Sequence, residues 1–501
     1  MNTKSRDLQT LAEEIGGVAR RYGLDFNDVV FEAVDYAQMN EIAAYGGFPS
    51  RYPHWSFGME YDQLAKGYAY GLQRIYELVI NNNPAYAYLM QCNTLVDQKL
   101  VMAHVYAHVD FFKNNAWFRH TNRKMVDAMA NHGTRVRKYV EKYGADTVES
   151  FMDSCKSLDN LIDFHAPHVR RRALTRPPLA GSEEDVVDHG VPRLRAKGYM
   201  DRYINPEEFL EKQRQLKQQQ SEEVRKVPAA PERDVLLFLL ERAPLERWQQ
   251  DILSIVRDEA YYFAPQGQTK ILNEGWATFW HSRMMTRDLL QASEVVDYAD
   301  HHSGTVLTPP GGFNPYKIGL ELFRHIEERW NRGQFGPEWE ACDDYQDKRR
   351  WDRKTGQGLQ KVFEVRKLYN DVTFIDTFLT EDFCRDQKLF HFSYNKQTDM
   401  YHIDSREFPK IKQQLLFQLT NFGQPIILVA DGNHRNRGEL YLRHEHEGVD
   451  LKLEHAEDTL RNLFRLWKRP VHLETTVFER RKILTFDGKE HTRREVKTNN
   501  S

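Results

Sequence analysis

The sequence has few cysteines, no long apolar run and almost no net charge. Four cysteines, Cys92, Cys155, Cys342 and Cys384, lie far apart without a Cys-x-x-Cys pair, which argues against a disulfide framework or a cysteine zinc site. No stretch approaches the ~18–20 uninterrupted apolar residues that a membrane-spanning helix needs. The N-terminal stretch carries acidic residues where a signal peptide would be apolar. We therefore expect a cytoplasmic protein without a membrane span.

The charge balance gives no reason to expect an anionic partner. The 501 residues include 70 Lys and Arg against 73 Asp and Glu, a formal net charge of -3. We therefore expect no nucleic-acid partner. The chain also contains no phosphate-binding loop, dinucleotide fingerprint or nucleophile elbow.

Hydrophobic periodicity predicts a mainly α-helical core, a buried helical array with a helical hairpin, followed by a C-terminal α+β domain. Apolar residues recur at helical spacing over 1–169 and again over 233–369, and we expect these two regions to pack together. Between them, 170–232 is rich in charge, proline and glutamine, which is typical of a linker. Short β-branched and aromatic runs in 370–501, with helical stretches between them, indicate the α+β domain.

The stretch "RDEAYYFAPQGQTKILNEGWATFWH" predicts two helices that each carry a glutamate on an apolar face. If the chain turns near Gly267, Glu259 and Glu274 lie at similar heights across an antiparallel pair. Two buried carboxylates so close together need a shared proton, a cationic partner or a metal. The structural alternative is that Arg257 or Arg283 neutralises them, or that one glutamate is exposed.

The stretch "LVDQKLVMAHVYAHVDFFKNN" places two histidines on one face of a predicted helix. His104 and His108 are four residues apart, a spacing that lets both imidazoles reach one metal ion. Asp110 is close enough in sequence to hold a ligand from behind. The alternative is a pair of core histidines that only form hydrogen bonds.

The segment "LNEGWATFW" resembles the "NEGxA" segment that supplies the glutamate ligand in zinc aminopeptidases of the gluzincin type. A single divalent, zinc-like metal held by His104, His108 and Glu274 is therefore one hypothesis. Those peptidases carry their general base directly after the first histidine, where this chain has Val105. Glu259 would then have to act as the base, and His281 as proton donor or fourth ligand.

Aromatic residues accompany both motifs. We expect Trp276 and Trp280 to keep the predicted metal site dry. The stretch "YPHWSFG", which contains His54, predicts either a packed surface loop or the wall of a pocket near the hairpin.

Four long strings cover nearly the whole chain in a family-specific order. "RYPHWSFGMEYDQL", "YELVINNNPAYAYLMQCNTLVDQKLVMAHVYAHVDFFKNN", "APLERWQQDILSIVRDEAYYFAPQGQTKILNEGWATFWH" and "LRHEHEGVDLKLEHAEDTLRNLFRLWKRPVHLETT" resemble the stage V sporulation protein R (SpoVR-like) family. The resemblance implies a bacterial role in spore cortex formation, or in stationary-phase and stress programmes. It also implies gene-level association with a serine protein kinase and a von Willebrand A-like protein, but supplies no catalytic residues.

Two functions are compatible with these observations. The first is a metal-dependent, hydrolase-like protein that acts on a cell-wall precursor or a peptide-like substrate. The second is a non-catalytic regulatory scaffold that binds partner proteins under kinase control.

Overall fold

The structure of this chain is a computed structural model. It describes residues 3–69, 77–169, 206–209, 211–212, 226–308, 313–395 and 400–496. Most of the predicted linker 170–232 lies outside the described residues.

The chain forms two compact units, each built from two separate stretches of sequence. Unit 1 comprises Met1–Glu149 and Tyr261–Gln424, and unit 2 comprises Ser150–Ala260 and Pro425–Ser501. The last boundary between the two units therefore falls at 424/425, whereas the change in residue pattern predicted the start of the C-terminal domain at 370. The difference arises because Phe374, Phe378 and Ile411 are buried in the core of unit 1.

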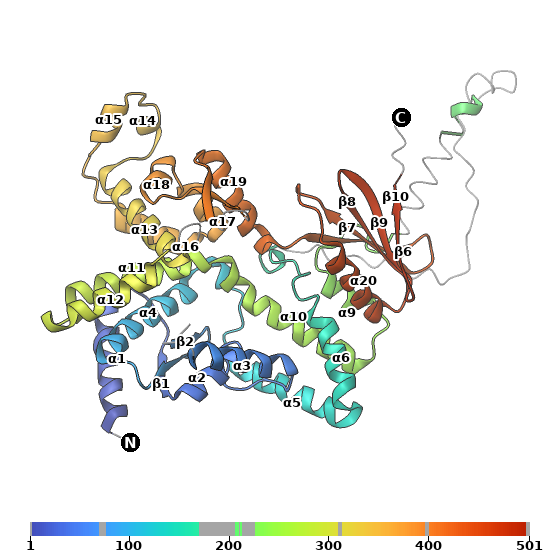
Figure 1. Cartoon of the computed structure of the whole chain (residues 1–501), viewed down its shortest axis with the longest axis horizontal. Helices are drawn as coiled ribbons and strands as arrows, with labels where there is room; N and C mark the ends of the chain where they lie inside the picture. Colours follow the sequence, from blue (N-terminus) through green and yellow to red (C-terminus); the bar gives the residue numbers. More distant parts are fainter. Residues whose placement is uncertain are drawn as a thin grey trace, which may run out of the picture. The chain divides into compact units, whose positions relative to one another are not determined.

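The helices that belong wholly or partly to unit 1 are shown in Figure 1. In chain order they are α1 Thr3–Arg21, α2 Tyr36–Ala44, α3 Trp55–Ala69, α4 Leu95–Asn114, α5 Met125–Tyr143, α6 Ala145–Lys156, α10 Arg247–Gln268, α11 Lys270–Met284, α12 Val295–Val306, α13 Pro315–Arg332, α14 Pro337–Glu340, α15 Tyr345–Arg350, α16 Gly358–Leu368, α17 Asp371–Phe378, α18 Glu381–Asp386 and α19 Phe408–Leu419. Helices α6 and α10 each run from one unit into the other.

Unit 1 also contains two small sheets, of which the sequence predicted strands only for the second, within 370–501. Strands β1 Val29–Val34, β3 Ala85–Met90 and β2 Glu77–Ile80 form one sheet in that order, and β4 His391–Asn395 pairs with β5 Met400–Ser405. Strand β3 is the central strand of the first sheet, parallel to β1 and antiparallel to β2. Its alternating "AYAY" pattern is too short to be distinguished from a turn by sequence alone.

Helix α4 lies in the interior of unit 1 and is buried on nearly every side from Val96 to Phe112. It begins with a capping box, in which the Thr94 side chain accepts from the backbone N–H of Asp97 and the Asp97 side chain accepts from Thr94. Each large apolar side chain that it buries stabilises the fold by about 1.5–3 kcal/mol. Polar groups on this helix therefore need partners within the protein.

Helix α11 packs between α4 and α13 and is also buried on all sides. Its first turn is held by the Asp371 carboxylate of α17, which accepts from the backbone N–H groups of Ile271 and Leu272 at 2.8 Å each. The predicted turn at Gly267 is wrong because Gly267 lies within α10, and only Thr269 separates α10 from α11.

Two glycines allow α11 and α13 to cross in direct backbone contact. A Cβ atom on Gly275 would overlap the Cα of Gly319, and a Cβ atom on Gly319 would overlap the carbonyl oxygen of Ile271. Neither position can therefore accept even alanine without a shift of one helix.

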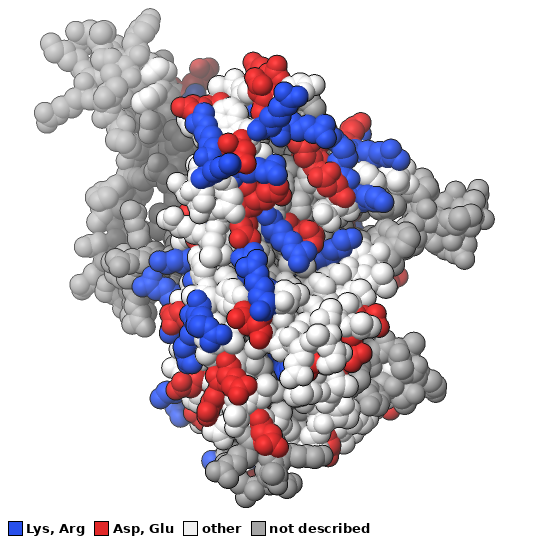
Figure 2. All heavy atoms as spheres, turned by 90° about the vertical axis from the view of Figure 1, so that its left-hand side faces the viewer, with Lys and Arg blue, Asp and Glu red and all other residues white. Residues whose placement is uncertain are grey.

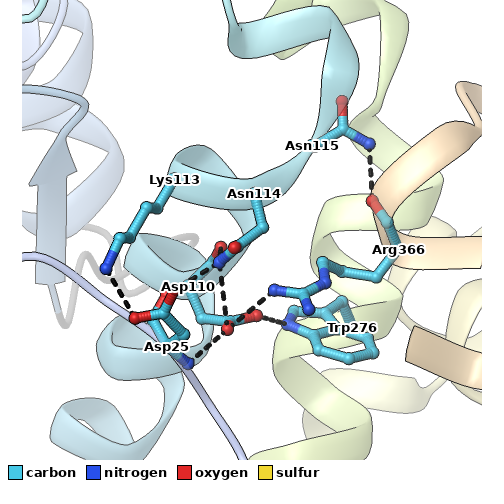
Figure 3. Close-up of polar contacts among 7 residues, drawn as sticks. All are labelled: Asp25, Asp110, Lys113, Asn114, Asn115, Trp276 and Arg366. Carbon is cyan, nitrogen blue, oxygen red and sulfur yellow. Dashed lines mark hydrogen bonds and ion pairs between the residues drawn. The ribbon is translucent and has the colours of Figure 1, made fainter. Parts of the chain in front are cut away.

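The Asp110 carboxylate on α4 joins several segments of unit 1 (Figure 3). Its Oδ1 accepts from the backbone N–H of Asp25 at 2.7 Å and from the Arg366 guanidinium at 2.8 Å, and its Oδ2 accepts from the Trp276 indole at 2.9 Å. The Asn114 side chain also donates to Oδ1, at 3.4 Å. This carboxylate is fully buried, and several N–H groups satisfy it.

Unit 2 is an α+β unit built around a five-stranded sheet. Its strands are β6 Ile426–His434, β7 Glu439–Glu445, β8 Val471–Val477, β9 Arg480–Phe486 and β10 His491–Glu495, in the order β10-β9-β8-β7-β6. Strands β7 and β8 are parallel and are joined through α20 Leu453–Trp467, which packs on one face of the sheet (Figure 1). Helix α9 Val235–Arg242 packs against β6. The predicted fold class, a mainly α-helical core plus a C-terminal α+β domain, is confirmed.

Surface charges of both signs are interspersed. On the face drawn in Figure 2, Lys and Arg alternate with Asp and Glu, and neither sign forms a broad patch there. Among the helices within the described ranges, none is both long and apolar enough to cross a membrane.

The close contact between α11 and α13 predicts that a glycine-to-alanine change lowers the free energy of unfolding at this crossing but not at an open helical position. Gly319→Ala should lower the free energy of unfolding by about 1–3 kcal/mol or more because the helices must separate. Gly17→Ala is the matched control, because a Cβ there meets nothing within 4 Å in the middle of α1, and it should stabilise by about 0.5–1 kcal/mol. Urea unfolding of both variants measures these changes; equal effects would contradict the close contact.

Asp110 predicts a pH dependence of stability. Burial raises its pKa from 3.8 to about 6, although Arg366 and the N–H donors lower it. The folded state therefore binds the Asp110 proton more tightly than the unfolded chain does. This proton stabilises the folded state fully below pH 3.8, and the stabilisation is lost as the pH rises through about 6. Across this pH window, the free energy of unfolding of the wild type should fall by about 3 kcal/mol relative to that of Asp110→Asn. Urea unfolding of both proteins at a series of pH values tests this, and a difference that is flat or grows with pH would contradict it.

Candidate metal centre

Helix α4 presents two imidazoles to the interior of unit 1, one helical turn apart. His104 and His108 have exposed fractions of 4% and 6%. Their ring centroids are 4.4 Å apart and their planes are nearly perpendicular, at 86°. The i, i+4 spacing thus places both rings on one face, as the sequence predicts.

Glu274 on α11 faces this pair. Its Oε2 lies 3.6 Å from Nε2 of His104 and 3.5 Å from Nε2 of His108. Among the described residues, these three form a group of potential ligands whose ligand atoms all lie within 4.8 Å of one another. The structure therefore brings together the three side chains that the sequence predicts as ligands.

The two oxygens of the Glu274 carboxylate have different environments. Oε1 accepts from the Lys270 ammonium at 3.0 Å, whereas Oε2 is buried and has no hydrogen-bond partner. Two ligand atoms at about 2.0–2.2 Å from a tetrahedral zinc ion stand about 3.3–3.6 Å apart. The distances from Oε2 to the two imidazole nitrogens have this length, so the three side chains fit a metal ion.

The imidazoles are held by their other nitrogens. Nδ1 of His108 lies 2.9 Å from Oδ1 of Asn273, and Nδ1 of His104 lies 2.9 Å from Nδ1 of His281. Because the Asn273 oxygen can only accept, Nδ1 of His108 carries a proton, and Nε2 is the nitrogen that faces Glu274. A lone pair that faces a carboxylate oxygen requires a cation between them, either a proton or a metal ion.

Electrostatics favour the protonation state that a metal ligand needs at His104 and Glu274, but not at His108. Burial and the neighbouring His108 lower the pKa of His104 to about 4. Burial opposes ionisation of Glu274, but the nearby imidazoles of His104 and His108 hold its pKa well below its usual value. For His108, burial lowers the pKa, but the contacts with Glu274 outweigh it and raise the pKa. Near neutral pH, Glu274 is thus a carboxylate and His104 is uncharged.

Two further groups near the cluster were missed by the sequence analysis. The Glu77 carboxylate on β2 is close enough to interact with His108 and Glu274; burial and Glu274 raise its pKa to about 7, while His108 lowers it. Tyr316 on α13 stacks with His104 at a centroid distance of 6.3 Å, and burial together with the nearby Glu274 raises the pKa of its phenol. Neither residue lies in a recognisable motif, since each reaches the cluster from a separate element.

His281 is a neighbour of the cluster but lies outside the three-ligand group. Its Nδ1 contacts His104, and its Nε2 lies 3.5 Å from Nδ1 of His302. Burial, with the nearby His104 and His302, keeps the pKa of His281 well below its usual value. A neutral imidazole in this position orients His104.

The residue that the sequence predicted to hold a ligand from behind makes other contacts. Asp110 bonds to Trp276 and Arg366 rather than to a ligand histidine, because it projects from another face of α4. The role of Asp110 in holding a ligand is therefore corrected to a structural one. Trp276 and Trp280 lie in the apolar core of unit 1, where they pack against each other and against Phe363.

The remaining two predicted residues are also placed by the structure. Glu259 is buried and belongs to unit 2, where it lies near enough to Asp159 to contribute to the raised pKa of that carboxyl. His54 is buried beside Ser56, whose hydroxyl lies 2.8 Å from Nδ1, and it lines a cleft of its own.

Comparison with known proteins agrees with the division of the fold. A family model described as SpoVR like protein matches residues 2–424, and one described as SpoVR-like C-terminal domain matches 425–477. The second match begins at Pro425, where the chain enters unit 2 for the second time. An uncharacterized protein of Escherichia coli (strain K12), YcgB, is 31% identical over 511 residues, which cover 93% of this chain and 91% of that protein. No solved structure matches the chain. With family models that together span residues 2–477, this chain belongs to the SpoVR family.

Proposed function

We propose that this chain is a metal-dependent, hydrolase-like SpoVR factor that acts on a cell-wall precursor or a peptide-like substrate. Family membership supports a role in spore cortex formation or in stationary-phase and stress physiology of the cell envelope. One observation supports the chemistry: the buried Oε2 of Glu274 lacks a hydrogen bond and faces two imidazole nitrogens at the spacing of metal ligands.

The ligand set selects the kind of metal. Two imidazoles and one carboxylate suit zinc or another divalent first-row metal, with a position left for water or substrate. A metal bound there would polarise a substrate carbonyl and lower the pKa of a water molecule. Asn273 and His281 would fix the orientation of His108 and His104, so that both Nε2 atoms point to Glu274.

The general base has two candidates, Glu77 and Glu259. Glu77 is the stronger one, because it belongs to the same unit as the ligands and interacts with two of them. It stands outside the group whose ligand atoms lie within 4.8 Å, which suits a carboxylate that takes a proton from water rather than one that binds metal. The Tyr316 hydroxyl would donate a hydrogen bond to the oxygen on which negative charge develops.

A non-catalytic scaffold is the alternative function. Such a scaffold would bind partner proteins, with the serine protein kinase and the von Willebrand A-like protein as candidates. It would need no metal, so metal content separates the two proposals.

The first experiment measures metal in the purified protein. Wild-type protein prepared without chelators should contain about one equivalent of a divalent metal by elemental analysis, as expected for one three-ligand site. His104→Ala, His108→Ala and Glu274→Gln should each lose most of it, because each removes one of only three ligands. Removal of metal by a chelator should also lower the melting temperature of the wild type.

His132→Ala is the matched control for this experiment. His132 on α5 is also buried, with an exposed fraction of 5%, but is not a member of the ligand group. This variant should keep its metal. A folded, metal-free wild type would favour the scaffold, and full metal content in Glu274→Gln would remove that residue from the ligand set.

The second experiment distinguishes the two candidate bases. Glu77→Gln should retain metal but lose hydrolysis by about 10²–10⁴-fold, because an amide cannot accept the proton. Glu259→Gln, a substitution of the same chemistry at a buried glutamate of unit 2, should leave turnover nearly unchanged. Mass spectrometry of purified peptidoglycan fragments and peptide mixtures after incubation measures the products. Normal turnover by metal-loaded Glu77→Gln would exclude Glu77 as the base.

A further inference from the structure

Helix α11 carries a buried polar group without a role in the proposed chemistry so far, the hydroxyl of Thr278. This side chain has an exposed fraction of 0%, and its Oγ1 has no hydrogen-bond partner among the described residues. A buried hydroxyl without a partner destabilises the fold, because water satisfies the same group in the unfolded chain. The stability of the fold therefore does not explain why α11 has a threonine at this position.

Other helical threonines of this chain satisfy their hydroxyl within their own helix. Thr134, Thr305 and Thr459 each donate from Oγ1 to the carbonyl oxygen four residues earlier, at 3.0, 3.1 and 2.8 Å. The equivalent acceptor for Thr278 is the carbonyl oxygen of Glu274, and that hydrogen bond is not formed. The Thr278 hydroxyl is therefore available to a partner outside its own helix.

Thr278 lies on the side of α11 that carries the metal centre. With a rotation of about 100° per residue, Glu274, Thr278 and His281 lie within about 60° of one another around the helix axis. The His104 ring contacts the first and the last of these three, with Nε2 3.6 Å from Oε2 of Glu274 and Nδ1 2.9 Å from Nδ1 of His281. Thr278 is therefore placed between the two contacts that α11 makes with a ligand imidazole.

Helix α13 approaches the same part of α11. The backbone contact of Gly275 with Gly319 lies one helical turn before Thr278, and Tyr316 of α13 stacks with His104. Thr278 thus lies where α4, α11 and α13 come together. A hydrogen bond is stronger in such a dry environment than in water.

We propose that the Thr278 hydroxyl donates a hydrogen bond to the oxygen atom of a carbonyl ligand at the coordination position that the two histidines and Glu274 leave open. This inference rests on the proposed metal centre and adds a residue that contacts the ligand rather than the metal. Thr278 lies outside the group of potential metal ligands. A donor that is fixed in place before the ligand arrives needs no reorganisation when charge develops on the oxygen.

Cobalt(II)-loaded full-length protein tests this proposal, because the visible absorption of bound cobalt reports ligand binding without turnover. Acetohydroxamate, which carries a carbonyl oxygen that binds metals, is the probe. Thr278→Val should take up as much cobalt as the wild type but bind acetohydroxamate at least about fivefold more weakly, because valine has the same shape without the donor. Thr278→Ser keeps the hydroxyl and should stay within about twofold of the wild type.

Thermal unfolding of the metal-free variants gives a second readout. Thr278→Val should raise the melting temperature of chelator-treated protein, because it removes a buried polar group that lacks a partner. Thr475→Val is the matched control. Thr475 in unit 2 is also buried, with an exposed fraction of 2%, but its Oγ1 lies 2.9 Å from Nδ1 of His444. This control should lower the melting temperature, because it leaves the imidazole without its partner.

The outcomes separate the role of Thr278 from the metal centre itself. A wild type that takes up no cobalt would overturn the metal centre and this role with it. Cobalt uptake with no response to acetohydroxamate, or with equal affinity in the wild type and Thr278→Val, would overturn only the role of Thr278. A lower melting temperature of metal-free Thr278→Val would assign the hydroxyl to the stability of the fold and would also overturn the proposal.

Discussion

The direct contact between Gly275 of α11 and Gly319 of α13 is the constraint on which the candidate site depends. Because neither residue has a side chain, the two helices meet at their backbones. Glu274 precedes the first glycine, and Tyr316 lies one helical turn before the second. The crossing that brings the helices together therefore also brings these two side chains to one place. A larger residue at the crossing would separate them, even if every polar residue of the site remained.

Two buried carboxylates in unit 1, those of Asp110 and Glu274, differ in how many hydrogen-bond donors surround them. Asp110 is contacted by a backbone N–H, an indole N–H, a guanidinium and a side-chain amide, all within hydrogen-bonding distance (Figure 3). Glu274 has one such donor, Lys270, on one oxygen, whereas the other oxygen faces two imidazole nitrogens and has no hydrogen-bond partner. Buried polar groups are normally satisfied. The unsatisfied oxygen of Glu274 therefore indicates a position for a cation, whereas Asp110 is fully explained by the stability of the fold.

Much of the candidate site could be predicted from local sequence patterns. The i, i+4 spacing of His104 and His108 follows from helix geometry, and the "NEG" segment identified Glu274. Glu77 and Tyr316 could not be predicted in this way, because they lie on a short strand and on a third helix, and only folding brings them near the ligands. The turn expected near Gly267 was wrong because Pro265 and Gly267 lie within α10 instead of ending it.

The sequence by itself determined the helical core, the α+β character of the C-terminal region and the three potential ligands. These features depend on periodicities of two to four residues, which a single helix or strand imposes on its own side chains. The tertiary structure alone decided that residues 150–260 and 425–501 share a unit, and that Asp110 and the tryptophans belong to the core. It also decided that Asn273 and His281 hold the imidazoles, because such contacts join segments distant in sequence, and local patterns carry no information about them.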